Sequence, residues 1–331
     1  MQQKYLFELG GENTELGKYE ALDLLSSNNY EPRLNDDFGK IISISTTKII
    51  DKKIISRLAM TKRVSKIILN SKKKNIANML EDIDEIDIGN NTFKIRQMVK
   101  SNLKEKEITI LIGEKINNKN KINLNNPQVT ILFYHNTEFF ITLQYNDEVT
   151  AYKKCLEHHI SLRPYFSPIG IHPRIARAMV NLSNCNETEI LLDPFCGTGG
   201  ILIEGSDMNL SVIGIDLKEK MVEYSRGNLK HYGLKGKVIE SDFEKLQNLN
   251  FKSIVCDPPY GIASTTGGEE ISGLIKRFIK AIENKMIKGQ RLVIALNDTK
   301  LLNKEKLKII HHFKWYIHKS LTRNILVLEK N

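Results

Sequence analysis

The sequence lacks the features that would place it in a membrane or outside a cell. No stretch approaches the roughly 18 consecutive apolar residues that a membrane helix needs. The N-terminus, Met1-Gln2-Gln3-Lys4, has no basic segment followed by an apolar one, as a signal peptide would. We therefore expect a cytoplasmic protein with no membrane partner.

Cysteine is also scarce. The four cysteines, Cys155, Cys185, Cys196 and Cys256, form no Cys-x-x-Cys pair. This spacing indicates neither a disulfide framework nor a zinc site, so we expect free, buried thiols and no bound metal. No segment forms a polybasic tail. The net charge of +10 suits a polyanionic partner, although many basic proteins bind no nucleic acid.

The length and composition are those of a folded, multidomain protein. With 331 residues, 41% of them hydrophobic and 27% charged, the chain can form two or three domains with their own cores. The first 160 residues predict an α+β arrangement. Strands are expected at 5–9, 40–45, 92–96, 107–113, 129–133 and 138–143, helices at 16–25 and 54–69, and a polar loop at 117–126. In the second helix, Lys62, Arg63 and Lys66 are expected to face solvent rather than RNA.

From about residue 186 the pattern changes to short apolar strands that alternate with helices. This alternation predicts parallel βαβ units in a Rossmann-like α/β domain. Seven strands are expected, at 189–195, 211–216, 237–242, 251–257, 290–297, 307–317 and 321–329. Between the fourth and fifth, residues 271–286 form an amphipathic helix with Lys276, Arg277 and Lys280 opposite its apolar stripe.

A glycine-rich loop follows the first of these strands and opens a helix. Its sequence is Asp193-Pro194-Phe195-Cys196-Gly197-Thr198-Gly199-Gly200. Glycines allow the backbone to approach a ligand closely, but such a loop is weak support for a ligand site by itself. Asp216 ends the second strand, where a carboxylate can accept both ribose hydroxyls of NAD or of S-adenosylmethionine. Asp242 ends the third and is suited either to an adenine amino group or to an N-cap.

The fourth strand is followed by Asp257-Pro258-Pro259-Tyr260, which distinguishes between these cofactors. The prolines are stiff and lack N–H groups, so the carbonyls of Asp257 and Pro258 can be held as acceptors for an amino group. Such acceptors would orient the nitrogen lone pair of a base toward a methyl donor. Tyr260 would stack on that base after it leaves its helix. The four features together predict amino methylation of a nucleobase.

Residues 186–331 therefore resemble a class I S-adenosylmethionine-dependent methyltransferase of the Asp-Pro-Pro-Tyr type. The resemblance implies a terminal antiparallel hairpin and a role for each motif in turn. Asp193, Gly197 and Gly199, with Pro194, Cys196 and Thr198, would line the methionine side of the cofactor, Asp216 the ribose, Asp242 the adenine, and Asp257, Pro258, Pro259 and Tyr260 the target amine.

Shorter segments resemble one subgroup of this class, the THUMP-domain tRNA guanine-N2 methyltransferases, especially the archaeal type that acts on guanosine at position ten. They are residues 9–13, 93–96, 122–127, 163–182 and 320–324. The resemblance implies a ferredoxin-like domain at 1–60, a THUMP RNA-binding domain at 61–150, a linker at 151–170 and the catalytic domain at 171–331. It implies tRNA as the partner and leaves open a small activating protein subunit, the modified position and whether one or two methyl groups are added.

Several interpretations compete with this one. The target could be ribosomal RNA or DNA, because these substrates share the motif, or the chain could be a noncatalytic RNA-binding subunit. Cys196 and Cys256 are expected to be buried rather than nucleophilic. Arg163, Arg174 and Arg177 are equally suited to tRNA phosphates and to ion pairs within the linker. Residues 261–268 have the composition of a loop that closes over the target base.

Overall fold

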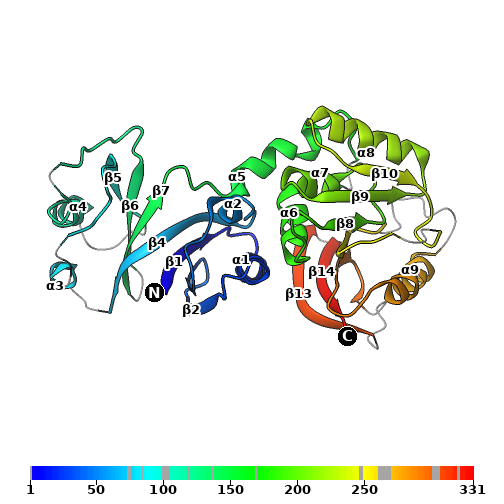
Figure 1. The fold of residues 1–331 in the computed structure, drawn as a ribbon, viewed down its shortest axis with the longest axis horizontal. Helices are drawn as coiled ribbons and strands as arrows, with labels where there is room; N and C mark the ends of the chain where they lie inside the picture. Colours follow the sequence, from blue (N-terminus) through cyan, green and yellow to red (C-terminus); the bar gives the residue numbers. More distant parts are fainter. Residues whose placement is uncertain are drawn as a thin grey trace. The chain divides into compact units, whose positions relative to one another are not determined.

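The computed structural model describes residues 2–72, 76–81, 83, 85–98, 105–117, 119–135, 138–167, 170–245, 249–259, 270–299, 306–318 and 321–331. Tyr260 and residues 261–268 lie outside these ranges. The chain forms two compact units (Figure 1). The N-terminal unit comprises Met1–Leu9, Asn28–Ser56 and Thr61–Thr150, and the C-terminal unit comprises Gly10–Ser27, Arg57–Met60 and Ala151–Asn331.

The N-terminal unit is built on one seven-stranded sheet. Its order is β2(Arg33–Asp37), β3(Ile41–Thr46), β1(Gln3–Leu9), β4(Thr61–Ser71), β7(Phe139–Tyr145), β6(Val129–His135) and β5(Phe93–Gln97). All neighbours are antiparallel except β5 and β6. The helices of this unit are α2(Lys52–Ile55), α3(Ile76–Leu80) and α4(Glu105–Gly113). This is the mixed α+β arrangement that the sequence predicts.

Two segments of this unit differ from the prediction. The expected helix at 54–69 is wrong, because residues from Thr61 onward form β4, which pairs with β1 on one side and β7 on the other. The expected strand at 107–113 is wrong as well. There, Ile108 and Ile112 are buried on one face of α4, so packing at helical spacing overrides the strand preference of the isoleucines. Arg63, expected on a solvated face, is part-buried and forms an ion pair with Glu8 at 2.6 Å.

The C-terminal unit contains a second seven-stranded sheet. Its order is β10(Lys237–Glu240), β9(Ser211–Asp216), β8(Ile190–Asp193), β11(Ser253–Cys256), β12(Arg291–Leu296), β14(Leu321–Lys330) and β13(Leu307–His318). The first five strands are parallel, and β14 runs antiparallel to both β12 and β13. All seven expected strands and the terminal hairpin are confirmed, so this unit is a Rossmann-like α/β domain.

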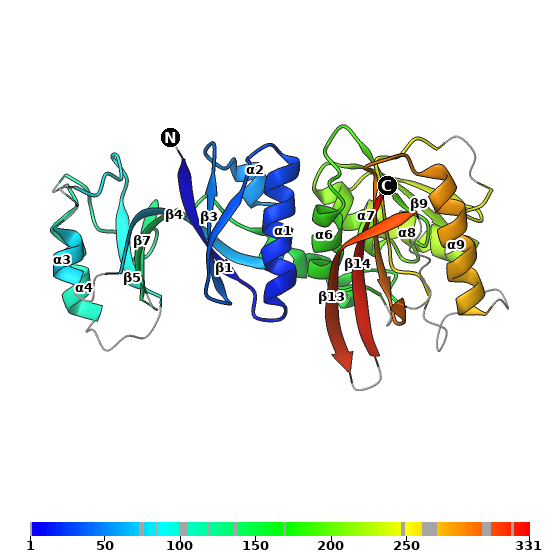
Figure 2. The ribbon, with the colours of Figure 1, turned by 90° about the horizontal axis from the view of Figure 1, so that it is seen from below.

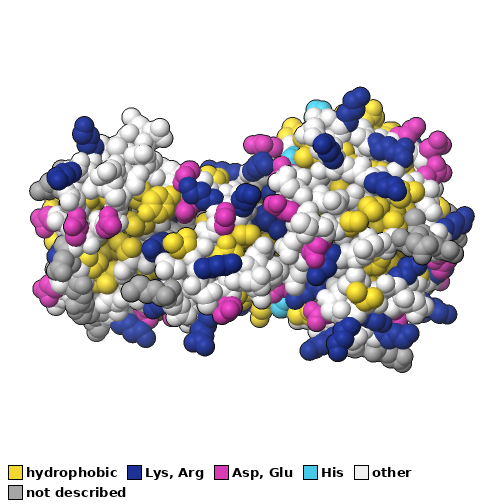
Figure 3. All heavy atoms as spheres, in the orientation of Figure 1, with side chains coloured by type: hydrophobic (Ala, Val, Ile, Leu, Met, Phe, Trp, Pro, Cys, Tyr) yellow, Lys and Arg dark blue, Asp and Glu magenta, His cyan; other side chains and the backbone are white. Residues whose placement is uncertain are grey.

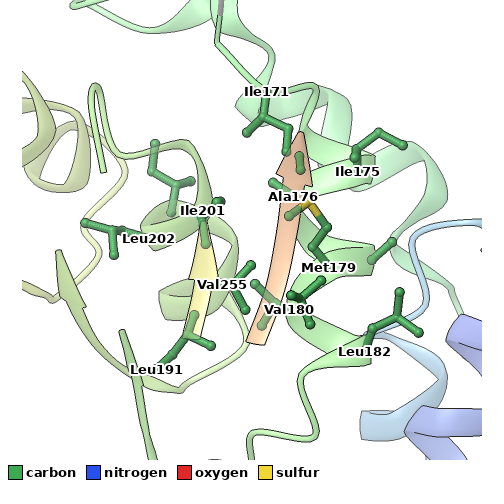
Figure 4. Close-up of a cluster of buried hydrophobic side chains, with 14 of the residues drawn as sticks. Ile171, Ile175, Ala176, Met179, Val180, Leu182, Leu191, Ile201, Leu202 and Val255 are labelled. Atoms are coloured by element: carbon green, nitrogen blue, oxygen red, sulfur yellow. The ribbon is translucent and has the colours of Figure 1, made fainter. Parts of the chain in front are cut away.

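Helices cover both faces of this sheet (Figure 2). One face packs against α1(Thr14–Ser27), α6(Pro173–Leu182), α7(Gly200–Asp207) and α8(Glu219–His231), and the other against α9(Ile271–Lys285). Successive strand residues alternate between the two cores: Leu191 and Val255 face α6 and α7 (Figure 4), whereas Leu192 and Ile254 face α9. This double coverage explains why the strands read as continuous apolar runs.

Residues 10–27 and 57–60 join the C-terminal unit through a buried carboxylate. Glu20 of α1 accepts hydrogen bonds from the backbone N–H groups of Ala59 (2.9 Å) and Met60 (2.8 Å). The Asn181 side chain of α6 donates a third, at 2.8 Å. These bonds attach α1, which precedes most of the N-terminal sheet in sequence, to the fold of the C-terminal unit.

The strand order reverses direction between β8 and β11, since the chain moves from β8 outward to β9 and β10 before it returns to β11. At such a switch point the loops that follow the two strands diverge, and the carboxyl ends of the strands border a crevice. The glycine loop follows β8 and the Asp-Pro-Pro segment follows β11. Both therefore reach this crevice. No helix in the described part of the chain is long and apolar enough to cross a membrane.

Candidate active site

A cavity of about 340 Å³ lies at the carboxyl ends of β8, β9 and β11 in the C-terminal unit. Most of the residues that the sequence singles out line it: Asp193, Pro194, Cys196, Gly197, Thr198, Asp216, Asp242, Asp257 and Pro259. Gly199 and Pro258 lie next to lining residues, and Tyr260 lies outside the described residues. The structure thus brings the glycine loop, both acidic strand ends and the Asp-Pro-Pro segment to one site.

The glycine loop takes a backbone conformation that few other residues could adopt. Gly197 has φ of 50° and Gly199 has φ of 84°, where Gly199 is the N-cap of α7. A Cβ at position 199 would lie 2.6 Å from Oγ of Ser225 and 3.4 Å from its Cα. The side-chain amide of Asn228 donates to the Thr198 carbonyl at 2.9 Å, so α8 fixes the loop from behind. The sequence requirement for glycine here is both conformational and steric.

Asp216 is oriented by the loop that it faces. Its Oδ2 accepts the Gly197 N–H and its Oδ1 accepts the Lys218 N–H, both at 3.0 Å. Burial raises the pKa of the Asp216 carboxyl, while these two backbone donors act in the opposite direction. Each oxygen retains a lone pair, so the carboxylate can accept hydrogen bonds from a pair of hydroxyls on a ligand.

Asp193, at the end of β8, is the most deeply buried carboxyl of the site. It accepts the backbone N–H of Phe195 at 3.1 Å and is 1% exposed. Burial raises its pKa well above the usual value, and the neighbouring Asp257 and Asp216 raise it further. A cationic ligand beside Asp193 would lower this raised pKa and favour the ionised carboxylate.

Asp257 follows β11 and pairs with a residue that is distant in sequence. Its Oδ2 lies 3.1 Å from Nη2 of Arg323 on β14, and both side chains are nearly buried. Burial raises the pKa of the Asp257 carboxyl to about 7, with Arg323 acting in the opposite direction. The carboxyl therefore changes charge near neutral pH, which is typical of functional carboxyls.

Asp242 is already bound by protein groups at the other end of the cavity. Its Oδ1 accepts the Glu244 N–H at 2.8 Å, and Nη1 of Arg277 lies 3.3 Å from both oxygens. Asp242 thus caps a turn at residues 243–244, where the sequence suggested the N-cap of a helix, a role compatible with binding adenine. The guanidinium of Arg277 also lies 4.7 Å above the ring of Phe243, which lines the cavity. An incoming adenine would share Asp242 with Arg277.

Several lining residues carry no recognisable motif. Phe243 packs with Phe195 and Phe278 at ring-centroid distances of 5.4 and 5.3 Å and forms an aromatic wall. The remaining residues of this group are Arg163, Ser167, Gly170, Ile171, Ile201, Leu217, Lys218, Met221, Ser241, Leu274 and Arg277. Only tertiary packing assembles them, although Arg163, Ser167, Gly170 and Ile171 lie in the segment at 163–182 that the resemblance already included.

Residues that were considered for other roles are structural. Cys196 and Cys256 are buried, as predicted, and burial raises the pKa of both thiols well above the usual value, which disfavours the nucleophilic thiolate. His172 caps α6, where its Nδ1 accepts the Arg174 N–H. His158 pairs with Glu204 at 2.9 Å.

The three linker arginines separate into two groups. Arg174 pairs with Glu12 at 2.9 Å, and Arg177 pairs with Glu204 at 3.1 Å and Asp207 at 2.7 Å. Both therefore make the internal ion pairs that were one of the two alternatives. Arg163 alone of the three lines the cavity.

The strand order, the glycine loop and the Asp-Pro-Pro segment at the switch point define a class I S-adenosylmethionine-dependent methyltransferase. In agreement, residues 161–315 match the protein family described as "RMKL-like, methyltransferase domain". Over its full length the chain resembles the crystal structure of TrmN from Thermus thermophilus, with a TM-score of 0.54 and 17% identity, covering 99% of this chain and 100% of that one. At this identity the likeness supports the fold.

Sequence relatives identify the family more narrowly. The chain is 32% identical to the tRNA (guanine(10)-N2)-dimethyltransferase of Methanothermobacter thermautotrophicus, over 97% of this chain and 98% of the relative. It is 33% identical to the enzyme of the same name from Pyrococcus abyssi, over 77% of this chain and 79% of the relative. The chain belongs to this archaeal, THUMP-type family of tRNA guanine-N2 methyltransferases.

Proposed function

We propose that this protein transfers methyl groups from S-adenosylmethionine to the exocyclic N2 of guanosine at position 10 of tRNA, once or twice. The observation that carries the proposal is the single cavity that joins the glycine loop and Asp216 to Asp257 and Pro259. A carboxylate suited to a nucleoside and acceptors suited to an amine thus lie at one cavity, which supports the proposal. The family membership supplies the nucleoside and the position, as the name of the relatives specifies.

The cavity fits S-adenosylmethionine in size and in chemistry. Its volume is within the range of small-molecule sites, and Gly197, which has open space where a side chain would be, leaves the loop backbone accessible to a ligand. Asp216 would accept the ribose hydroxyls, and Phe243 would contact the adenine. A positive charge beside the buried carboxyls of Asp193 and Asp257 would lower their raised pKa values and favour the ionised carboxylates. The cofactor supplies an electrophilic methyl group on a sulfonium.

Asp257 and Pro258 act on the target amine. In place of the Asp257 carbonyl that the sequence suggested, we assign the Asp257 carboxylate, together with the carbonyl of Pro258, as the acceptors of its two hydrogens, which orients the nitrogen lone pair toward the methyl donor. Only the ionised form of Asp257 accepts with both oxygens. Tyr260, expected to stack on the guanine, and residues 261–268, expected to close over it, lie outside the described residues, and both roles stay predictions.

The N-terminal unit is proposed to recognise the tRNA. We propose a ferredoxin-like domain at 1–60, of which residues 10–27 and 57–60 belong to the C-terminal unit, then the THUMP domain at 61–150, the linker at 151–170 and the catalytic domain at 171–331. Figure 3 shows Lys and Arg scattered over each unit with acidic residues among them, so positive charge is dispersed on this face. We also propose that the enzyme is cytoplasmic, like its tRNA substrate. The need for a small activating protein subunit stays a prediction.

Incubation with methyl-labelled S-adenosylmethionine and an unmodified archaeal tRNA transcript tests the proposal. We expect label in N2-methylguanosine and N2,N2-dimethylguanosine after nucleoside digestion, and mass spectrometry of tRNA fragments should locate it at position 10. A transcript with adenosine at that position is the matched control and should take up no label. A stimulation of the rate by a cell extract from the same organism would reveal an activating subunit.

The competing functions give different outcomes. Transfer to DNA or ribosomal RNA in preference to tRNA would replace the proposed substrate. Tight tRNA binding without methylation at any substrate concentration would indicate a noncatalytic RNA-binding subunit. Undiminished methylation by Asp257→Ala would refute the role of that carboxyl.

A further inference from the structure

Arg163 is a buried cation whose two terminal nitrogens make no hydrogen bond within the described part of the chain. The residue is only 4% exposed, and burial lowers the pKa of its guanidinium. Leaving charged donors unpaired in a protein interior costs more than leaving neutral ones unpaired. The arrangement is therefore expected to be compensated by an anion.

The rest of the side chain is held in place. Nε of Arg163 donates to the His158 carbonyl at 3.0 Å, and His158 itself pairs with Glu204 of α7. The Tyr232 hydroxyl lies near the guanidinium but outside hydrogen-bond geometry, and its own proton goes to the Glu157 carbonyl at 3.3 Å. The linker thus fixes the guanidinium while its outer nitrogens stay unsatisfied.

The position of the guanidinium indicates which anion it meets. It packs against Gly200, the first residue of α7, where an added Cβ would lie 3.2 Å from Nη1 and 3.8 Å from Nη2. Arg163, Gly200 and Ile171 all line the cavity. A helix N-terminus carries partial positive charge and free N–H groups, so the guanidinium and α7 favour negative charge at the same place.

We propose that Arg163 and the N-terminus of α7 bind the α-carboxylate of the cofactor. This inference rests on the proposed cofactor. The other acidic candidate, a tRNA phosphate, would approach from the surface, whereas Arg163 is buried beside the loop that holds the methionine side. A guanidinium pairs with a carboxylate through two parallel hydrogen bonds, which suits the two free nitrogens. The cofactor thereby contacts the linker as well as the catalytic domain.

Calorimetric titration of the full chain with two ligands tests this assignment. S-adenosylhomocysteine carries the carboxylate, and 5′-methylthioadenosine has the same nucleoside without it. Arg163→Met removes the charge at similar volume. We expect it to weaken S-adenosylhomocysteine by roughly tenfold or more, the equivalent of one charged hydrogen bond, and to leave 5′-methylthioadenosine within about twofold. Arg163→Lys should retain part of the preference for S-adenosylhomocysteine over 5′-methylthioadenosine. It also provides a second variant if Arg163→Met folds poorly.

Arg174→Met is the matched control, because Arg174 lies in the same segment but pairs with Glu12; both ligands should bind to it as to the unaltered protein. Equal weakening of both ligands by Arg163→Met would mean that the residue only supports the fold of the site. Unchanged binding of both, with weaker tRNA binding, would assign Arg163 to a phosphate. Either result overturns the inference but not the proposed function, whereas failure of the unaltered protein to bind either ligand would overturn both.

Discussion

Arg323 reaches across an intervening strand to hold Asp257. The two residues lie on β14 and directly after β11, with β12 between those strands, yet Nη2 and Oδ2 are 3.1 Å apart. Both side chains are nearly buried, at 6% and 11% exposed. The terminal hairpin contains the segment at 320–324 that resembles the family, but the resemblance gave Arg323 no role; the hairpin supplies a charge to the residue expected to bind the target amine.

This ion pair predicts a pH dependence of methylation. Burial raises the pKa of Asp257 to about 7, so the accepting carboxylate is lost as the pH falls through neutrality. Single-turnover rates should fall on the acid side of about pH 7. Arg323→Gln removes the positive neighbour and should move this acid limb upward by about one unit or more, whereas Arg323→Lys should move it less.

Arg291→Gln is the control for the pH profile, because Arg291 belongs to the neighbouring strand β12 but pairs with Asp23 at 2.6 Å, near the opposite end of the strand. Its profile should keep the original midpoint. An acid limb that stays in place in Arg323→Gln would show that Asp257 is not the titrating group.

The buried carboxyl of Asp193 is expected to lower the stability of the fold while it contributes to cofactor binding. Its folded-state pKa is raised, so the unfolded chain releases this proton at lower pH than the folded protein, and the fold is penalised as the pH rises above the ordinary aspartate range. Asp193→Asn removes the penalty and keeps an acceptor for the Phe195 N–H. In the absence of cofactor, Tm should rise by a few degrees at pH 8 and change little near pH 4, while binding of S-adenosylmethionine weakens.

Asp207→Asn should behave in the opposite way. Burial would raise the pKa of Asp207, but hydrogen bonds from Lys154 and Arg177 outweigh it and lower the pKa. Its carboxylate therefore stabilises the fold above the ordinary aspartate range, and that stabilisation is lost as the pH falls through the lowered pKa. Calorimetric scans should show a lower Tm for this variant at pH 8. If Asp193→Asn and Asp207→Asn shifted Tm in the same direction at pH 8, the opposite pKa shifts assigned to the two carboxyls would be contradicted.

Alanine substitutions at Gly199 and Gly233, which have similar backbone conformations, should affect cofactor affinity very differently. Gly199 has φ of +84° and would place a Cβ 2.6 Å from Oγ of Ser225, whereas Gly233 has φ of +66° and open space around it. Gly199→Ala must displace the loop or α8, and S-adenosylhomocysteine affinity should fall by roughly tenfold or more. Gly233→Ala costs only about 1 kcal/mol of backbone strain and should leave the affinity unchanged. Equal affinities in a titration would show that the loop does not contact the cofactor.

The buried ion pairs of Arg177 are expected to stabilise the C-terminal unit. It is 3% exposed and bridges Glu204 and Asp207, so Arg177→Met leaves a buried carboxylate without this partner. The free energy of unfolding should fall by about 3–5 kcal/mol. Lys252→Gln removes the more exposed pair with Glu189 and should cost less than about 1 kcal/mol. Denaturant titration followed by circular dichroism compares them, and equal losses would argue against a buried network.

Prediction of helices and strands from the sequence fails where the local secondary-structure preference and the tertiary packing disagree. Residues 107–113 are rich in isoleucine, which favours strands, but Ile108 and Ile112 are buried at helical spacing in α4. Conversely, the charged residues after Thr61 occur at a spacing compatible with a helix, yet two neighbouring strands pair with both edges of this segment. The outcome depended on partners far along the chain, which no local window contains.

The sequence alone determined three features of the catalytic domain, because each is a local pattern. They are the Asp-Pro-Pro segment with its stiff backbone, the glycine loop, and the seven strands with their alternation of apolar segments. The charge partner of Asp257 on β14 and the position of Arg163 against Gly200 were decided only by the tertiary structure. Arginine is common and its long side chain can meet a site from many places, so its role follows from where the chain brings its guanidinium and not from its neighbours in sequence.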